Sequence, residues 1–254
     1  MDILNIVILA LIQGITEFLP ISSSSHLILL SELTSFPDQG LGFDIALHAG
    51  SLLAILVYYK TEIRKILSLS QEGNSYIKFL ILASIPLPVI GMIFIDVVSI
   101  HMRNIQSIAI MTILFALVLY FADQNRKNNK DILNSSFLII LFIGLMQTLA
   151  IIPGVSRAGI VITAALLVGF NRNESIKIAF LLSIPAIFMA SCYQALQLLD
   201  TNGSNALSDN IIGLILSFIF SYLTIKLFIT TINKVTFSPY IIYRVILGTV
   251  LIVI

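Results

Sequence analysis

The sequence QGITEFLPISSSSH, residues 13–26, decides the fold, because it interrupts a long apolar stretch with groups that lipid does not tolerate. A membrane-spanning helix needs about 20 largely apolar residues in a row. Glu17, Pro20 and His26 divide the apolar stretch into two halves, each too short to cross a membrane alone. Residues 2–35 are therefore expected to form a re-entrant hairpin of two helices, which enters the membrane and returns to the same side.

A second interrupted stretch, LMQTLAIIPGVSRAG, occupies residues 145–159. It predicts a second re-entrant hairpin over residues 135–170. The segments PISS (20–23) and PGVS (153–156) lie between the apolar halves of the two predicted hairpins, and ASIP (83–86) and LSIP (182–185) form another matching pair. These echoes favour an inverted-topology repeat whose broken helices meet near the middle of the membrane.

The rest of the chain contains six apolar stretches that are long enough to cross. With 58% hydrophobic residues, 11% charged residues and a mean hydropathy of +1.03, the chain is far poorer in charge than a soluble domain, which has about 25% charged residues. We expect an all-α, polytopic integral membrane protein with a single transmembrane domain over residues 1–254. The predicted spans are Phe43–Tyr59, Tyr76–Val98, Ile105–Ala122, Ile176–Leu199, Ile211–Ile232 and Tyr240–Ile254.

The charged residues argue against one class of partner, and the positions of Lys and Arg predict how the spans are oriented in the membrane. The net charge of +1 gives no reason to expect nucleic-acid binding, and the lone Cys192 excludes an internal disulfide. With both termini outside, the predicted topology leaves only Arg103 outside and Arg157 within the membrane. The other basic residues then face the cytoplasm: Lys60, Arg64, Lys65, Lys78, Arg126, Lys127, Lys130, Arg172, Lys177, Lys226, Lys234 and Arg244.

The first hairpin gathers several reactive side chains. Gln13 and Glu17 are four residues apart and therefore share one helix face. Ser22 is a natural N-cap for the second half-helix, which places Ser23 and His26 on one face of it. A simpler alternative is that Glu17 lies at the water boundary and the serines only cap a helix, but two ionisable groups in an apolar stretch favour a functional site.

The second hairpin carries the features of an anion site. Gly154 permits a tight turn, and Ser156 can cap the following half-helix, so that its first amides point into the turn. Arg157 adds a forked cation suited to phosphate or carboxylate oxygens. The alternative, that Arg157 reaches the cytoplasmic surface, is disfavoured because this residue lies near the deepest point of the hairpin.

Four other polar residues are less informative. Asp44 and His48 share a helix face at the outer end of the first span and are candidates for the border of the pocket. Lys226 and Arg244 are interpreted as anchors whose long side chains reach the membrane surface.

The first motif, QGITEFLP with Ser22, Ser23 and His26 after it, resembles the N-terminal signature of the bacterial undecaprenyl-diphosphatase, or bacitracin-resistance, family. The segment PGVSR, residues 153–157, is similar to the second signature of that family. The resemblance implies hydrolysis of undecaprenyl diphosphate to undecaprenyl phosphate and inorganic phosphate, which recycles the lipid carrier of cell-wall synthesis. It also implies a multi-pass protein of the bacterial plasma (inner) membrane, an active site that faces the outer, periplasmic side, and a divalent cation, Mg or Ca.

Site residues follow from the same resemblance. The catalytic residues would be Glu17, Ser23, His26 and Arg157, with Glu17 also binding the metal. The substrate-binding residues would be Gln13, Ser22, Gly154, Ser156 and Arg157.

The chain departs from the family pattern at a few positions. Gln13 stands where many members have Glu, Ala158 where a second Ser is usual, and Val161 where Thr is usual. Thr163 lies on the wrong helix face to replace the missing hydroxyl at Val161. If the pocket faces these positions, restoring both hydroxyls is expected to raise activity.

The sequence leaves several questions open. Either Ser23 or His26 could be the nucleophile, and an activated water could replace covalent attack. Crossed hairpins in an inverted repeat are also a transporter plan, so the rival functions are a polyprenyl-phosphate flippase and a small-anion secondary transporter. A structural partner is a weaker rival. Membrane lipids are expected partners, and a homo-oligomer is possible.

Overall fold

The computed structural model of the protein describes residues 2–34, 40–68, 70–124, 130–199, 207–232 and 235–253, and every regular element in these residues is a helix. The α-helices are α1 (Ile3–Thr16), α2 (Ser23–Leu33), α3 (Leu41–Tyr58), α4 (Lys60–Ile66), α5 (Gln71–Ser84), α6 (Pro86–His101), α7 (Ile105–Gln124), α8 (Phe137–Thr148), α9 (Arg157–Leu167), α10 (Arg172–Leu199), α11 (Leu207–Ile232) and α12 (Ser238–Val253). Two short 3₁₀ helices, η1 (Ile132–Asn134) and η2 (Leu149–Ile151), lie on either side of α8. The all-α prediction is confirmed.

Within the described residues, 5 helical stretches are long and apolar enough to cross a membrane: α3, α5 together with α6, α7, α10 and α11. They correspond to all the predicted spans except Tyr240–Ile254. That span is α12, which has 16 residues and is therefore about 24 Å long, at 1.5 Å per residue. The hydrocarbon core of a bilayer is about 30 Å thick, so a full crossing by α12 stays a prediction.

The two Ser-Ile-Pro segments both lie inside long helical stretches. Near Pro86, Ile85 alone separates α5 from α6, and its backbone stays in the right-handed helical region, with φ of −56° and ψ of −44°. Pro86 then stands in the first turn of α6, where its missing N–H is best tolerated. In α10 the helix continues through Pro185.

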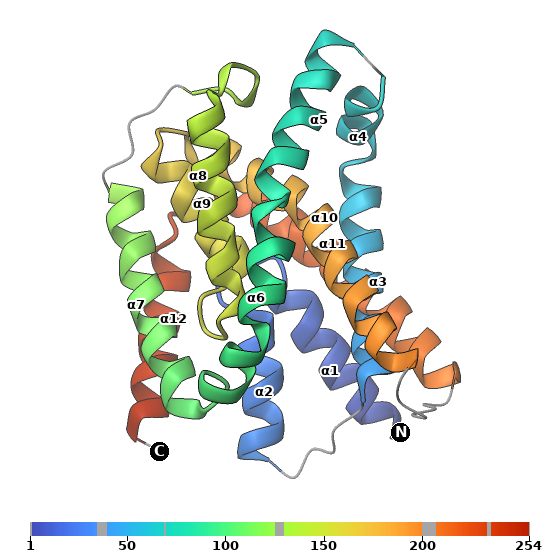
Figure 1. Cartoon of the computed structure of the whole chain (residues 1–254). Helices are drawn as coiled ribbons and strands as arrows, with labels where there is room; N and C mark the ends of the chain where they lie inside the picture. The colour runs from blue at the N-terminus through green and yellow to red at the C-terminus, as the bar shows by residue number, and fades with distance from the viewer. Residues whose placement is uncertain are drawn as a thin grey trace.

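The two interrupted stretches form helix–turn–helix hairpins, α1–α2 and α8–α9, which approach the middle of the molecule from opposite ends (Figure 1). Both chain termini lie at the end from which α1–α2 enters. Ser22, with φ of 76°, and Ser156, with φ of 70°, are the non-glycine residues with positive φ in the described chain, and each directly precedes the second helix of its hairpin. The two turns thus share one unusual backbone geometry, which supports the predicted repeat.

Most of the basic residues are predicted to face the cytoplasm, and the structure is consistent with this placement for some of them and not for Arg244. The three basic residues of α4, Lys60, Arg64 and Lys65, lie at the end of the molecule opposite the termini (Figure 1). Arg126, Lys127 and Lys234 lie outside the described residues. The interpretation of Arg244 as a surface anchor is wrong, because its side chain is completely buried and its guanidinium donates hydrogen bonds to backbone carbonyls. Lys226 is exposed, as expected of an anchor.

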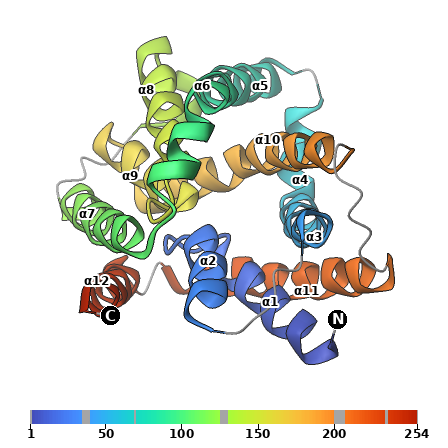
Figure 2. The same ribbon diagram turned by 60° about the horizontal axis from the view of Figure 1, so that its bottom comes forward.

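Helix α9 is buried inside the protein. Every residue from Ala158 to Leu166 is buried, and α7, α8 and α10 pack around this helix (Figure 2). A short apolar helix that is buried on all sides can end in the interior, because other helices rather than lipid surround its first turn. The fold therefore holds Ser156 and Arg157, at the start of α9, inside the protein.

Candidate active site

A cavity of about 590 Å³ lies between the two hairpins, α6 and α10. The polar residues that line it include Thr16, Glu17, Ser22, Ser23, Ser24, His48, Ser156 and Arg157. The rest of the lining is largely apolar and includes Leu87, Met92 and Ile95 of α6 and Ala186, Phe188 and Leu196 of α10. The cavity therefore joins a cluster of charged and hydroxyl groups to an apolar groove.

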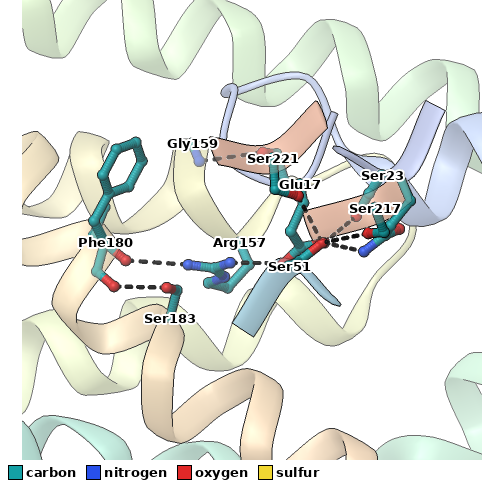
Figure 3. Close-up of polar contacts among 12 residues, drawn as sticks. Glu17, Ser23, Ser51, Arg157, Gly159, Phe180, Ser183, Ser217 and Ser221 are labelled. Carbon is teal, nitrogen blue, oxygen red and sulfur yellow. Dashed lines mark hydrogen bonds and ion pairs between the residues drawn. The ribbon is translucent and has the colours of Figure 1, made fainter. Parts of the chain in front are cut away.

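Glu17 is the centre of the polar cluster (Figure 3). Its Oε1 lies 2.7 Å from Nη2 of Arg157. Its Oε2 accepts hydrogen bonds from Oγ of Ser23 at 2.7 Å and from Nε2 of Gln13 at 3.2 Å. The predicted shared helix face of Gln13 and Glu17 is confirmed, and the carboxylate of the first hairpin meets the guanidinium of the second.

Arg157 crosses from α9 to two other elements. Besides Glu17, its guanidinium contacts the carbonyl of Ala179 on α10, with Nη1 at 3.1 Å from the oxygen (Figure 3). The side chain is only 12% exposed. Its position excludes the alternative in which Arg157 reaches the cytoplasmic surface, and it leaves a cation facing the cavity.

The two serines with positive φ differ in what their hydroxyls do. Oγ of Ser156 accepts a hydrogen bond from the amide of Gly159 at 3.2 Å, so the predicted cap is confirmed. Ser22 occupies the N-cap position of α2, but its side chain makes no cap bond; its Oγ lies 2.9 Å from Oγ of Ser25 instead. The residue three positions on explains the difference: Ser25 has a hydroxyl that engages Ser22, whereas Gly159 has no side chain. The predicted N-cap position of Ser22 is confirmed, and the side-chain cap bond expected there is absent.

His26 lies outside the cavity lining. Its Nδ1 is 2.7 Å from the carbonyl of Ser22, and its Nε2 is 2.6 Å from the hydroxyl of Tyr243, on which the ring stacks. The structure therefore does not bring His26 together with Glu17 and Ser23, and its catalytic role stays a prediction. A different histidine, His48, lines the cavity.

The remaining predicted positions can also be placed. Gly154, with φ of 98°, makes the tight turn that was expected of it. Asp44 is not among the residues that line the cavity, although its carbonyl lies 2.8 Å from Nδ1 of His48. Ala158 and Val161 are buried and do not line the cavity either. The condition under which restoring both hydroxyls would raise activity is therefore not met, because these two residues pack in the core around α9.

Two features escaped the sequence reasoning. The first is the burial of Arg244, although an arginine in an otherwise apolar stretch is the same signal that singled out Glu17 and Arg157. The second is a buried hydroxyl cluster where α3 packs on α11: Oγ of Ser51 lies 3.2 Å from that of Ser217 and 3.0 Å from that of Ser221 (Figure 3). The four-residue spacing of Ser217 and Ser221 on α11 could have predicted this contact, since small polar residues four apart often mark a close helix–helix contact.

A divalent cation fits this site only if the substrate supplies ligands. Among the described residues, no group of three or more His, Cys, Asp or Glu side chains could hold a metal ion. Mg²⁺ is commonly bound by one or two carboxylates together with substrate phosphates. An ionised carboxylate has about four lone-pair positions. The three contacts to Glu17 leave one for a cation.

A family model described as "Bacitracin resistance protein BacA" matches residues 6–250. The chain belongs to the BacA family. Relatives named "Undecaprenyl-diphosphatase" include one from Saccharophagus degradans, 43% identical over 256 residues, which span 98% of this chain and 96% of the relative. Another, from Campylobacter concisus, is 43% identical over 260 residues, or 99% of this chain and 98% of the relative. A third, from Teredinibacter turnerae, is 41% identical over 260 residues, again 99% and 98%. The family resemblance inferred from the two motifs is confirmed.

Proposed function

We propose that this BacA-family protein is a membrane hydrolase that converts undecaprenyl diphosphate to undecaprenyl phosphate and inorganic phosphate. The observation that carries the proposal is the cavity: the Glu17–Arg157 pair and Ser23 lie at its polar part, and an apolar groove leads away from them. An amphiphile with a diphosphate head and a hydrocarbon tail matches both parts. The names of the relatives support the same substrate.

The guanidinium of Arg157 and the first amides of α9 would hold the diphosphate. A forked cation suits two phosphate oxygens at once, and the leading amides of a helix have no partner within the helix. Glu17 keeps Arg157 oriented before the substrate binds, since Nη2 already contacts its carboxylate at 2.7 Å.

Ser23 would be the nucleophile. Its hydroxyl already donates to Glu17 at 2.7 Å, so the carboxylate can take the proton as Oγ attacks the terminal phosphorus. In that step the bond from Oγ to phosphorus forms, and the bond from phosphorus to the bridging oxygen breaks, releasing the lipid monophosphate. Water then attacks the phosphoserine, inorganic phosphate leaves, and Glu17 returns a proton to Oγ of Ser23.

A divalent cation, Mg or Ca, would be held by Glu17 together with the diphosphate oxygens. When bound, it would neutralise charge on the diphosphate. The residues of the chain perform the positioning and the proton transfer described above.

The proposed membrane arrangement has six crossing helices, two re-entrant hairpins and an active site open to the outer face of the plasma membrane. Cysteines placed at exposed positions test it after Cys192 is replaced by serine. An impermeant thiol reagent added outside is expected to label a His101→Cys variant and not a Ser68→Cys variant. The reverse pattern would overturn the arrangement.

Phosphate release by the purified protein tests the function. In detergent with a divalent cation, the protein is expected to release one phosphate per undecaprenyl diphosphate and leave the lipid monophosphate. Lipid movement between leaflets without phosphate release would favour the flippase alternative instead.

A further inference from the structure

Arg244, on α12, carries a charge into the interior of the protein, where its side chain is completely buried. Its Nη1 donates to the carbonyl of Pro20 at 3.2 Å. Its Nη2 donates to the carbonyls of Gly154, at 2.7 Å, and Val155, at 3.2 Å. Charged groups inside a membrane protein need such partners, and backbone carbonyls can supply them.

The three carbonyls belong to two different turns. Pro20 lies in the turn of the first hairpin, a few residues after Glu17, and Gly154 and Val155 lie in the turn of the second hairpin, just before Arg157. One guanidinium therefore ties together the two turns that carry the acidic and the basic member of the active-site ion pair.

The shape of the guanidinium makes this tie restrictive. Its N–H groups diverge in one plane at fixed angles, so the two turns must keep one separation for both Nη atoms to remain bonded. The first turn of α9 packs directly against the same group, because a Cβ added at Gly159 would lie 3.2 Å from Nη1 of Arg244. Neither turn can shift far without breaking a contact of Arg244.

We propose that Arg244 is a positioning residue: it fixes the distance between the two hairpin turns, and this distance lets Arg157 meet Glu17 across the cavity. The effect of Arg244 on the rate of phosphate release rests on the proposed function. Its effect on the distance between the two turns does not. The rival interpretation is that Arg244 only fills space in the core.

Distances between spin labels separate the two interpretations. Nitroxide labels at Ser31→Cys on α2 and Leu167→Cys on α9, both exposed positions, report the relative placement of the hairpins in a Cys192→Ser background. Arg244→Met keeps a long unbranched side chain and removes only the polar bonds. We expect a narrow distance distribution in the parent protein, and a shifted or broadened one in the variant.

Lys226→Met is the matched control, because it removes an exposed basic residue of the preceding helix and should leave the distribution unchanged. If Arg244→Met does not fold, Arg244→Lys replaces it. A single Nζ cannot occupy both Nη positions, so this variant should release one of the two turns.

Phosphate release completes the test. A displacement of about 1 Å at a catalytic site can cost about 100-fold in rate, and we expect a loss of this order in kcat/KM for either Arg244 variant and no loss for Lys226→Met. A folded Arg244 variant whose distance distribution matches the parent's would overturn the inference, whatever its activity. If the parent releases no phosphate, the proposed function fails, and the distance measurement still decides the role of Arg244.

Discussion

The two hairpins share one backbone feature, a serine with positive φ directly before the second helix, and differ in chemistry. Each has a buried glutamine in its first helix, Gln13 or Gln147, at the same spacing before the serine with positive φ. The charged side chains that follow diverge: the first hairpin presents the carboxylate of Glu17 to the cavity, and the second presents the guanidinium of Arg157. The two turns are similar in backbone at these serines, and the difference in charge between the side chains that follow makes them complementary.

The first helices of the two hairpins, α1 and α8, also pack on their neighbours in similar ways. A Cβ added at Gly14 of α1 would lie 2.5 Å from Cβ of Phe220 on α11, and one added at Gly144 of α8 would lie 2.7 Å from the carbonyl oxygen of Ala83 on α5. Each half-helix thus sits against a neighbouring helix through a glycine that allows close approach. Both hairpins are packed in comparable ways. Substitutions in the two hairpins should therefore affect phosphate release differently because of the side chains that the hairpins carry.

Ser23 gives the largest expected effect. Ser23→Ala removes the proposed nucleophile of the first hairpin and should reduce the rate of phosphate release by on the order of a million-fold, as for other enzymes that lose a nucleophile. Ser24→Ala is the matched control, because Ser24 also lines the cavity, and it should remain active. Activity within tenfold of the parent in Ser23→Ala would exclude covalent attack by this residue and favour an activated water.

Arg157 tests the contribution of the second hairpin. Arg157→Lys keeps the charge but cannot contact Glu17 and the Ala179 carbonyl together as the fork does. Loss of a buried, hydrogen-bonded charge contact costs about 2–5 kcal/mol, to be measured as the change in kcat/KM. Arg172→Lys, at the ion pair with Asp123 outside the cavity, should leave kcat/KM nearly unchanged. A mild effect of Arg157→Lys would show that the diphosphate needs only a point charge there.

The two glutamines compare the hairpins directly. Gln13 donates to the charged Glu17 at 3.2 Å, whereas Gln147 donates to the neutral carbonyl of Ala83 at 3.4 Å. A hydrogen bond to a charged group is worth about 1.5–3 kcal/mol, so Gln13→Leu should slow phosphate release by about 10- to 100-fold. Gln147→Leu should leave the rate within about twofold, since no charged group loses a partner. Equal losses in the two variants would contradict the division of chemistry between the hairpins.

The smallest expected effect concerns the hydroxyls that the second motif lacks. Because Ala158 and Val161 are buried and do not line the cavity, Ala158→Ser with Val161→Thr should change phosphate release by less than about threefold. A helical threonine can bond the carbonyl four residues back, as Thr163 does with Gly159 at 2.7 Å. A tenfold increase would mean that α9 turns its other face to the substrate.

Local patterns made much of this structure predictable. The hairpins follow from polar residues inside apolar stretches, the contact between Gln13 and Glu17 follows from helical periodicity, and the cap by Ser156 follows from its place before a helix. Each of these inferences depends only on residues that are close together in the sequence, which is why the sequence alone was sufficient for them.

The contacts between hairpins could not be predicted in the same way. Glu17 and Arg157 are separated by 140 positions in the chain, so their distance depends on how the hairpins cross. His26 shares a helix with Ser23, yet helical spacing alone could not show that its ring stacks on Tyr243 of α12. Arg244 was misinterpreted because sequence alone does not reveal which carbonyls are close enough to solvate a charge.

Because an apolar groove lies between α6 and α10, the rate of this enzyme should depend on the concentration of its substrate within the membrane. Removing a polyprenyl tail from the bilayer costs about 0.8 kcal/mol for each CH₂ group, so the substrate reaches Glu17 and Arg157 by diffusing sideways within the lipid. The rate then depends on the mole fraction of diphosphate lipid in the membrane rather than on its amount per volume of solution. Extra detergent or lipid at fixed total substrate should therefore slow the reaction by surface dilution, without any change in the protein.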